Sequence, residues 1–145
     1  MHVQEIMTAN PTCCGPETSL QEVAKMMADE DCGCLPVVDE NNKAVGTITD
    51  RDITCRTVAE GKNPLDLTAA DCMSSPVISV SKNSDIDECC KLMEDNQLRR
   101  LLVVDDAGEC CGIVAQADIA LKAPRQVSGE LVKEVSKESA SASAA

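Results

Sequence analysis

The chain has 145 residues, which suits one globular domain or two small domains fused into one unit. It contains no Phe, Tyr or Trp, so a bound base cannot stack on a protein ring and the core must be built from aliphatic and sulfur-bearing side chains. Its 13 basic and 25 acidic residues give a net charge of −12, which with the missing aromatic residues excludes nucleic acid as an expected partner. A phosphate site would have to supply its own local cations.

The N-terminal sequence MHVQEIMTANPT has no basic start followed by an apolar run. No segment of the chain has the length of a membrane span. We therefore expect a cytoplasmic protein with no membrane partner.

The first half of the chain predicts the order strand, helix, strand, strand, helix. The expected elements are an extended run at residues 12–14, a helix after Ser19, strands at 34–38 and 44–48, and a helix that begins at Thr49 or Asp50. Ser19 is a good N-cap, and apolar residues recur after it at helical spacing. The last helix carries Asp52 in its first turn.

The second half predicts the same order again. The expected elements are a strand at 77–80, a helix after the N-cap Asp85, strands at 101–104 and 111–114, and a helix that carries Asp118. A constant offset of 66 residues relates the two halves without a gap, as Met7 to Met73 and Gly46 to Gly112 illustrate. The same supersecondary unit therefore occurs twice, and we expect the two copies to pack about a pseudo-twofold axis.

These patterns divide the chain into four parts. They are a first repeat at 1–58, a linker with a short helix at 59–71, a second repeat at 72–122 and a C-terminal tail at 123–145. The short helix is predicted over residues 65–72. In the tail, residues 125–138 have an amphipathic pattern that predicts a helix docked on the module or on a partner, with apolar residues Val127, Leu131, Val132 and Val135. The last seven residues have low complexity and are predicted to be disordered.

The 10 cysteines form no clear metal-binding or disulfide pattern. They include three adjacent pairs and one C-x-C but no C-x-x-C, and the only histidine is His2. Zinc sites usually combine two C-x-x-C elements, or cysteine with histidine, at ligand spacing. We therefore interpret most cysteines as small apolar side chains and predict no metal site, while a redox or metal role is kept as the alternative.

Several motifs make the chain resemble a pair of CBS domains. In the first copy they are Ile6-Met7-Thr8, Leu35-Pro-Val-Val-Asp39 and Gly46-Thr-Ile-Thr-Asp-Arg-Asp52. In the second copy they are Cys72-Met73, Leu101-Leu-Val-Val-Asp105 and Gly112-Ile-Val-Ala-Gln-Ala-Asp118. The layout is similar to the small stand-alone bacterial CBS-pair proteins, a group that includes hypoxic response proteins.

The resemblance implies an α/β (α+β) fold of two tandem β-α-β-β-α repeats, commonly a homodimer. It implies clefts that bind an adenine nucleotide such as AMP, ADP or ATP as a regulatory ligand, and a conformational signal passed to an effector protein that the sequence does not identify. In this family the Thr or Ser of the last motif commonly contacts phosphate and the Asp contacts the ribose. These roles fall on Thr49 and Asp52 in one site and on Asp118 in the other. Similar proteins place phosphate-contacting basic residues before the second strand, where this chain has Arg99 and Arg100.

The two copies differ at these positions. The second copy has Ala115 where the first has Thr49, and the first has Gly33-Cys34 where the second has Arg99-Arg100. We expect the cleft with Asp52, which would receive the two arginines from the other repeat, to be better equipped for phosphate than the cleft with Asp118. The expected adenine-lining residues are Thr12, Cys13, Cys34 and Pro36.

Each candidate residue also suits a structural role. Thr49 and Asp52 are typical of a helix cap and its first turn, Arg99 and Arg100 of exposed charges, and the adenine-lining candidates of core packing. The alternative function is redox or metal-responsive signalling through the cysteines without nucleotide binding, and a third candidate is a structural dimerisation module with vestigial clefts. Catalysis is disfavoured, because the sequence has no phosphate-binding P-loop, no G-x-S-x-G motif and no histidine besides His2.

Overall fold

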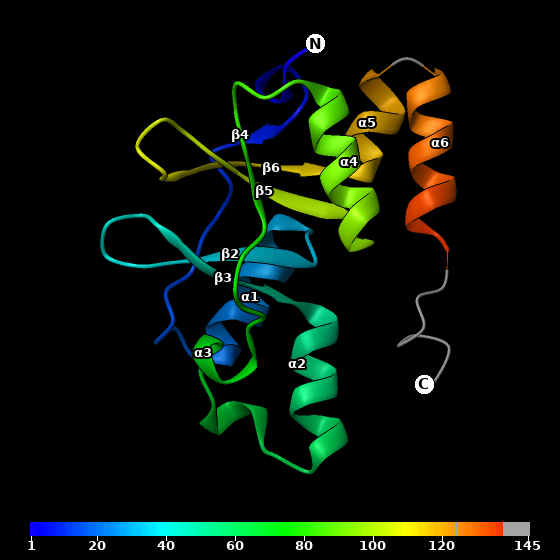
Figure 1. The fold of residues 1–145 in the computed structure, drawn as a ribbon. Helices are drawn as coiled ribbons and strands as arrows, with labels where there is room; N and C mark the ends of the chain where they lie inside the picture. Colours follow the sequence, from blue (N-terminus) through cyan, green and yellow to red (C-terminus); the bar gives the residue numbers. More distant parts are fainter. Residues whose placement is uncertain (124, 138–145) are drawn as a thin grey trace. The chain divides into compact units, whose positions relative to one another are not determined.

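The computed structural model describes residues 1–123 and 125–137, so the predicted disorder of residues 139–145 lies outside the described residues. The chain forms two compact units. The first-repeat unit comprises Asn10–Ile78 and Ala107–Cys110, and the second-repeat unit comprises Met1–Ala9, Ser79–Asp106 and the chain from Cys111 onward. Each unit combines helices with strands, as the sequence predicts (Figure 1).

The first-repeat unit is built around an antiparallel pair of strands. Its elements are α1 (Leu20–Glu30), β2 (Cys34–Val38), β3 (Ala44–Thr49), α2 (Asp50–Arg56), the 3-10 turns η2 (Val58–Glu60) and η3 (Pro64–Asp66), and α3 (Ala69–Cys72). Leu35 of β2 lies opposite Ile48 of β3, and both residues are buried. The predicted extended run at residues 12–14 is reduced to one parallel bridge, between Cys14 and Val37.

The linker does not form the single helix predicted over residues 65–72. Instead, η3 and α3 are separated by Leu67 and Thr68, whose backbones are extended. The carbonyl of Leu67 accepts the N–H of Leu20 at 3.0 Å. The start of α1 therefore takes the backbone acceptor that a continuous helix would have used internally.

The second-repeat unit contains a four-stranded sheet with the order β1-β6-β5-β4. Its elements are η1 (Val3–Glu5), β1 (Thr8–Ala9), β4 (Ser79–Ser81), α4 (Ile86–Asn96), β5 (Arg100–Val104), β6 (Cys110–Ala115), α5 (Gln116–Lys122) and α6 (Arg125–Val135). Strands β4 and β5 are parallel, whereas β1 and β6 are antiparallel. The first residues of the chain thus complete the sheet of the second repeat.

Both predicted N-caps of the long helices are confirmed. The Ser19 hydroxyl accepts the N–H of Glu22 at 3.2 Å at the start of α1. The Asp85 carboxylate accepts the N–H of Asp87 at 3.0 Å at the start of α4. Each bond satisfies an amide that has no partner inside its own helix.

The 66-residue offset of the sequence reappears in the strand pairing. The bridge from Cys14 to Val37 corresponds to the pairing of Val80 with Val103. In the same way, the bridge from Ser74 to Thr47 corresponds to the pairing of Thr8 with Ile113. The segment after Met7 precedes the first repeat, but it pairs with β6, the last strand of the second repeat. In the same way, the segment after Met73 precedes the second repeat but pairs with β3, the last strand of the first repeat.

This pairing explains why glycine occupies the same place in both last strands. A Cβ at Gly112 would lie 2.5 Å from Met7 Sδ and 3.1 Å from the carbonyl oxygen of Thr8. A Cβ at Gly46 would lie 2.8 Å from Met73 Sδ and 3.0 Å from the carbonyl oxygen of Ser74. The methionine can move, but the paired backbone behind it cannot do so without loss of the pairing.

Gly112→Ala is therefore expected to destabilise the protein by about 1–3 kcal/mol, because the added methyl group overpacks the β1–β6 contact. Thermal unfolding of the variant measures the loss. Gly129→Ala on α6 is the matched control, since nothing lies within 4 Å of a Cβ there. That change should instead stabilise its helix by about 0.5–1 kcal/mol. An unfolding temperature of Gly112→Ala equal to that of the wild type would contradict the close approach.

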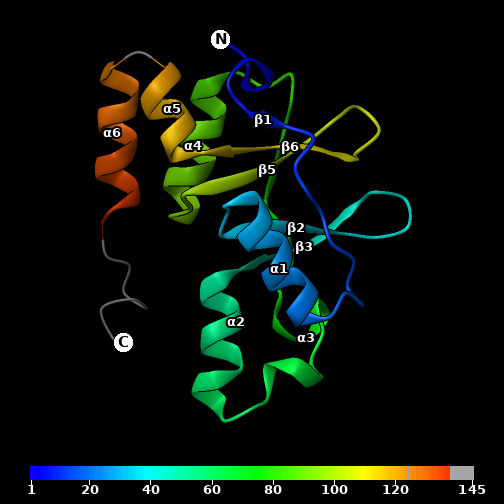
Figure 2. The ribbon, with the colours of Figure 1, turned by 180° about the vertical axis from the view of Figure 1, so that it is seen from behind.

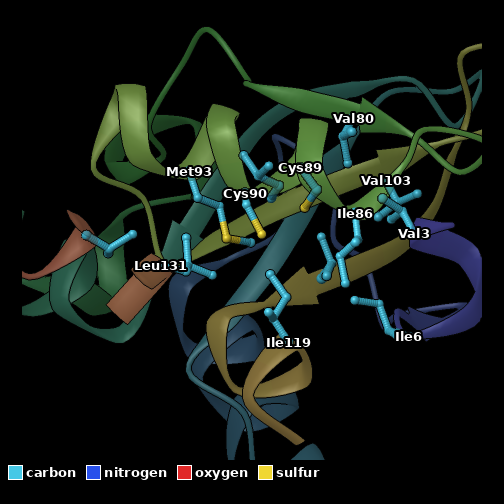
Figure 3. Packing of buried hydrophobic residues seen from close by; sticks show 13 residues of the cluster. Val3, Ile6, Val80, Ile86, Cys89, Cys90, Met93, Val103, Ile119 and Leu131 are labelled. Carbon is cyan, nitrogen blue, oxygen red and sulfur yellow. The ribbon is translucent and has the colours of Figure 1, made fainter. Parts of the chain in front are cut away.

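The core of the second-repeat unit is aliphatic and sulfur-bearing, and it includes the C-terminal helix. Buried side chains from α4, α5 and the sheet converge with Leu131 of α6, as the close view shows (Figure 3). Leu131 is fully buried and Val135 is 6% exposed. Helix α6 lies beside α4 and α5 in both views of the ribbon (Figure 1, Figure 2). The predicted amphipathic helix is confirmed, and it docks on the module itself, although Val132 faces outward at 39% exposure.

Acidic side chains meet where α6 packs on α4. Partial burial, and then the nearby charges of Glu130, Glu134 and Asp95, raise the pKa of Glu94, while Lys91 opposes the shift. Glu94 therefore takes up a proton at higher pH in the folded chain than in the unfolded chain. Stability contributed by the protonated form is present at low pH and is lost as the pH rises through the raised pKa.

Glu94→Gln removes this ionisation and is expected to stabilise the protein at pH 7. The gain expected from relieving the like charges is about 0.3–0.5 kcal/mol, or roughly 1–2 °C in Tm. It should disappear below about pH 4, where the wild-type carboxyl is protonated as well. Thermal unfolding of both proteins between pH 4 and pH 7 measures it, and a difference in Tm that does not change with pH would contradict the assignment.

Candidate functional site

In the first repeat, the candidate site lies where β3 ends and α2 begins. Thr49 is the N-cap of α2, and its hydroxyl accepts the N–H of Asp52 at 3.0 Å. The Asp52 carboxylate returns the contact, because its Oδ2 accepts the N–H of Thr49 at 3.0 Å. The structure thus brings these two predicted residues together in a reciprocal helix cap. The cap uses one Asp52 oxygen, and Oδ1 lies 3.9 Å from Nη2 of Arg56.

The second repeat keeps half of this arrangement. Asp118 Oδ2 accepts the N–H of Ala115 at 2.8 Å, which repeats the contact between Asp52 and Thr49. Ala115 has no hydroxyl, so the return bond of the first repeat has no equivalent here. The carboxylate is therefore held in place in both repeats, but only the first adds a hydroxyl that could donate to a ligand.

In each repeat, the residue before the second strand forms a backbone hydrogen bond with the first residue of the helix that carries the aspartate, α2 in the first repeat and α5 in the second. The carbonyl of Gly33 accepts the N–H of Asp50 at 3.0 Å, and the carbonyl of Arg99 accepts the N–H of Gln116 at 2.8 Å. The side chains that flank the two junctions differ in charge, with Gly33 and the Asp50 carboxylate in the first repeat and Arg99 and the Gln116 amide in the second. A Cβ at Gly33 would lie 3.0 Å from Asp50 Oδ2. The first junction is therefore acidic and the second is basic.

A hollow of about 260 Å³ opens at the second junction. Its lining consists of Arg99, Arg100, Ala115, Gln116, Ala117 and Ala120. Both arginines are exposed, and no acidic side chain belongs to the lining. The Gln116 Oε1 atom is buried and has no hydrogen-bond partner among the described residues. Buried polar atoms normally have a partner, so this oxygen is suited to accept a hydrogen bond from a ligand.

The structure thus places Arg99 and Arg100 beside Ala115 and Gln116 of their own repeat. The sequence analysis assigns these arginines to the Asp52 cleft. That assignment depends on how the two units are arranged, and it stays a prediction. Gln116 is a candidate that the sequence prediction missed. The 66-residue offset could have found it, because Gln116 is the counterpart of Asp50.

Arg56 has a structural role that the sequence did not reveal. Its Nη1 donates to the carbonyls of Cys72 and Met73, at 2.8 and 2.9 Å. Its Nη2 donates to the hydroxyl of Ser74 at 3.2 Å. Arg56 therefore fixes the segment that follows α3, next to Asp52, and its donors are largely engaged by the protein.

The four predicted adenine-lining residues belong to one unit, and one of them, Cys13, lines a cavity described in that unit. The N–H of Cys14 donates to the carbonyl of Pro36 at 3.0 Å, so residues 12–14 run along β2. Cys34 and Pro36 are buried within β2. Cys13 lines a cavity of about 510 Å³ together with Cys14, Gly15, Pro16, Glu17, Thr18, Val38, Asp39 and Glu40. Thr12, Cys34 and Pro36 are not part of this lining.

All ten cysteines are reduced thiols, and they are not equivalent. Burial raises the pKa of Cys14 and of Cys90 to about 11 and that of Cys89 to about 12. A hydrogen bond from the Cys110 thiol instead lowers the pKa of Cys13, against the opposing effects of burial and of Cys14. Among residues 1–123 and 125–137, no three His, Cys, Asp or Glu side chains gather closely enough to hold a metal ion.

None of the helices within residues 1–123 and 125–137 combines the length and the apolar character that crossing a bilayer requires.

Comparison with known proteins identifies the class to which these paired junctions belong. The family model "CBS domain" matches residues 3–56 and 69–124, so the chain belongs to the CBS domain family and is a CBS-pair regulatory module. Hypoxic response protein 1 of Mycobacterium tuberculosis is 34% identical over 132 residues, which are 91% of this chain and 92% of that protein. The uncharacterized protein MK0525 of Methanopyrus kandleri is 40% identical over 116 residues, or 80% of this chain, but the match spans only 57% of that protein.

Solved structures of CBS pairs have the same fold. The crystal structure of hypoxic response protein I with two coordinated zinc ions has a TM-score of 0.78 at 34% identity and covers 86% of this chain and 100% of that one. The CBS pair of protein MJ0100, in complex with 5′-methylthioadenosine and S-adenosyl-L-methionine, has a TM-score of 0.74 at 30% identity, with coverage of 83% and 98%. CBSX2 in complex with AMP has a TM-score of 0.72 at 25% identity, with coverage of 84% and 95%.

Proposed function

We propose that this CBS pair is a non-enzymatic sensor that binds an adenine nucleotide and transmits the binding as a change of conformation. The observation that carries the proposal is the basic hollow at the start of α5, where Arg99, Arg100 and the buried Gln116 oxygen converge. Relatives of the same fold are named as complexes with AMP and with adenosine derivatives, which supports an adenosine ligand here.

The two arginines suit the phosphate end of such a ligand. The protein carries a net charge of −12, so an anion approaches against an unfavourable long-range field. Two guanidinium groups next to each other, with no carboxylate in the lining, offset that field locally and present fork-shaped donors to phosphate oxygens. Gln116 would accept a hydrogen bond from a ligand N–H or O–H group in the same hollow.

The capped aspartates suit the ribose. A carboxylate accepts from two vicinal hydroxyl groups, and one oxygen of each aspartate is held by a backbone N–H three residues earlier, that of Thr49 for Asp52 and of Ala115 for Asp118. In the first repeat, Thr49 accepts an N–H through its oxygen and keeps its hydroxyl proton for a phosphate. We propose two unequal sites, because Ala115 lacks that hydroxyl whereas Asp50 places a further negative charge at the first junction.

Signalling would follow from a difference in ligand affinity between two arrangements of the module, which shifts their populations. We further propose that the module acts as a homodimer on a separate effector protein.

Thermal unfolding with a panel of ligands tests the proposal. AMP, ADP, ATP, S-adenosylmethionine and GMP would be added at concentrations up to 1 mM. A ligand at 100 times its Kd is expected to stabilise the folded protein by about 2.7 kcal/mol, which is a rise in Tm of roughly 5–10 °C. An adenine-specific rise that is reduced in Asp52→Ala or Asp118→Ala would support the proposal. No rise with any adenosine ligand would overturn it.

A further inference from the structure

Two thiols that are far apart in the sequence meet in the first-repeat unit. Cys13 precedes α1, whereas Cys110 is the first residue of β6, and both belong to the same compact unit. The Cys110 thiol forms a hydrogen bond with the Cys13 sulfur. Cys13 Sγ also lies 3.3 Å from the carbonyl oxygen of Pro11, so its orientation is defined.

The backbone on the Cys110 side of this contact is held firmly. The N–H of Cys110 donates to the carbonyl of Asn42 at 3.0 Å, and Asn42 Nδ2 donates to the carbonyl of Cys110 at 3.2 Å. The backbones of Lys43 and Glu109 form an isolated antiparallel β-bridge, and Lys43 Nζ donates a hydrogen bond to the carbonyl of Ala107. The turn before β6 is therefore fastened to the β2–β3 turn, which keeps the Cys110 sulfur next to Cys13.

Cys13 is also the accessible member of the pair. It is half-buried and lines the 510 Å³ cavity, whereas Cys110 is 7% exposed. Glu17, Asp39 and Glu40 line the same cavity and make its surroundings acidic. An anionic oxidant such as glutathione disulfide would be repelled there, whereas an uncharged peroxide would not.

Accessibility and ionisation together distinguish Cys13 from the deeply buried cysteines. Reactive thiols are those with a larger thiolate fraction and access to solvent, and sensor cysteines commonly have a second thiol beside them. Cys14, Cys89 and Cys90 are buried and their thiols stay protonated at neutral pH. The hydrogen bond from Cys110 favours the thiolate of Cys13.

We propose that Cys13 and Cys110 are a peroxide-oxidised thiol pair that closes to an intramolecular disulfide. The Cys13 thiolate attacks one oxygen of hydrogen peroxide, so the S–O bond forms and the O–O bond breaks. The hydroxide that leaves takes up the proton lost by Cys13 and becomes water. The Cys110 sulfur then attacks the Cys13 sulfenic acid, so the S–S bond forms, the S–O bond breaks, and the second hydroxide leaves with the Cys110 proton. The two thiols lose two electrons and two protons, and the peroxide becomes two molecules of water.

The disulfide would change what the chain can do. It would tie the segment before α1 to the start of β6, and β6 runs directly into Ala115 at the basic hollow. A disulfide that closes a long loop restricts the conformations open to the chain between its two cysteines. The proposal does not depend on nucleotide binding, so each can fail without the other.

The test is peptide mapping of the fully reduced full-length protein after treatment with one equivalent of hydrogen peroxide. The expected product is a Cys13–Cys110 cross-linked peptide pair, about 2 Da lighter than the sum of the two reduced peptides and lost on treatment with dithiothreitol. Cys110→Ala should abolish this product and leave Cys13 as a sulfenic acid that dimedone labels. Cys111→Ala, which removes the neighbouring thiol, is the matched control and should keep the cross-link.

Three results would overturn the proposal. One is a cross-link that survives in Cys110→Ala, and another is a vicinal product that joins Cys13 to Cys14. The third is oxidation confined to the exposed Cys55 while Cys13 stays reduced. Unfolding temperatures of the reduced variants establish that each protein is folded before the peroxide is added.

Discussion

Replacing Arg99 and Arg100 together by alanine is expected to weaken AMP binding by about 100-fold. Each hydrogen bond from a charged donor contributes about 1.5–3 kcal/mol, so the loss of two such bonds to one phosphate costs at least about 3 kcal/mol. The arginines are exposed and line the hollow without contributing to the buried core, so the variant should keep the wild-type fold. Isothermal titration calorimetry with AMP measures the Kd of both proteins.

A matched control separates phosphate contact from net charge. Lys25→Ala/Lys62→Ala also removes two positive charges, and both lysines are exposed and neither belongs to the lining of the hollow. This control should bind AMP within about twofold of the wild type, because exposed charges that do not contact the ligand are screened by salt. Equal losses in both double variants would mean that the arginines act only through the long-range field. Unchanged AMP binding in the arginine variant would show that the phosphate does not bind in this hollow.

Leu131→Ala is expected to cost about 2–5 kcal/mol of folding stability, the usual range for a buried leucine in a core. Leu131 is fully buried and joins α6 to the cluster formed by α4, α5 and the sheet. With a total stability of about 5–15 kcal/mol for a domain, this single change should lower Tm by roughly 6–15 °C. Chemical and thermal unfolding of the purified variant measure the loss.

The neighbouring residue on the same helix serves as the control. Val132 is 39% exposed, so Val132→Ala should change stability by no more than about 0.5 kcal/mol. Equal and small effects of both changes would show that α6 does not dock on the second-repeat unit in solution. A large effect confined to Leu131 would show that the C-terminal helix is part of the folded module.

Most of the local structure could be predicted from the sequence because it depends on short-range patterns. Ser19 and Asp85 cap their helices through hydrogen bonds that span two or three residues, and the helical spacing of apolar residues after them needs no tertiary information. The duplication of the sequence made it possible to predict the same order of strands and helices in both repeats. The helix predicted over the linker was wrong, because the Leu67 carbonyl accepts the N–H of Leu20 and not an N–H of a continuous linker helix.

Long-range pairing was less accessible. Strand β1 has only two residues, and nothing in their local pattern indicates that Thr8 lies opposite Ile113. The signal that exists is indirect: Met7 and Met73 occupy equivalent positions, and each lies against a glycine of a last strand, Gly112 and Gly46. Two copies of one contact suggest a shared constraint, but the partner in each contact is defined only by the folded chain.

The site shows the same division. The contact between Thr49 and Asp52 follows from a spacing of three residues at a helix start. The neighbourhood of Arg99 depends instead on the folded β5–α5 junction, where its carbonyl meets the N–H of Gln116. Arg56 could not have been assigned from sequence, since its partners are backbone carbonyls of Cys72 and Met73.

The most direct test of nucleotide binding at these junctions is a titration of isotopically labelled protein with AMP, followed by amide chemical shifts. Binding as proposed predicts the largest shifts at the starts of α2 and α5, at residues 49–52 and 115–118, and at Arg99 and Arg100 before β5. Because the amides of Thr49 and Ala115 donate to the carboxylates of Asp52 and Asp118, they should respond when a ribose engages these carboxylates. Saturable shifts confined to these segments would support the assignment. Absence of shifts at millimolar AMP, or shifts centred elsewhere in the chain, would contradict it.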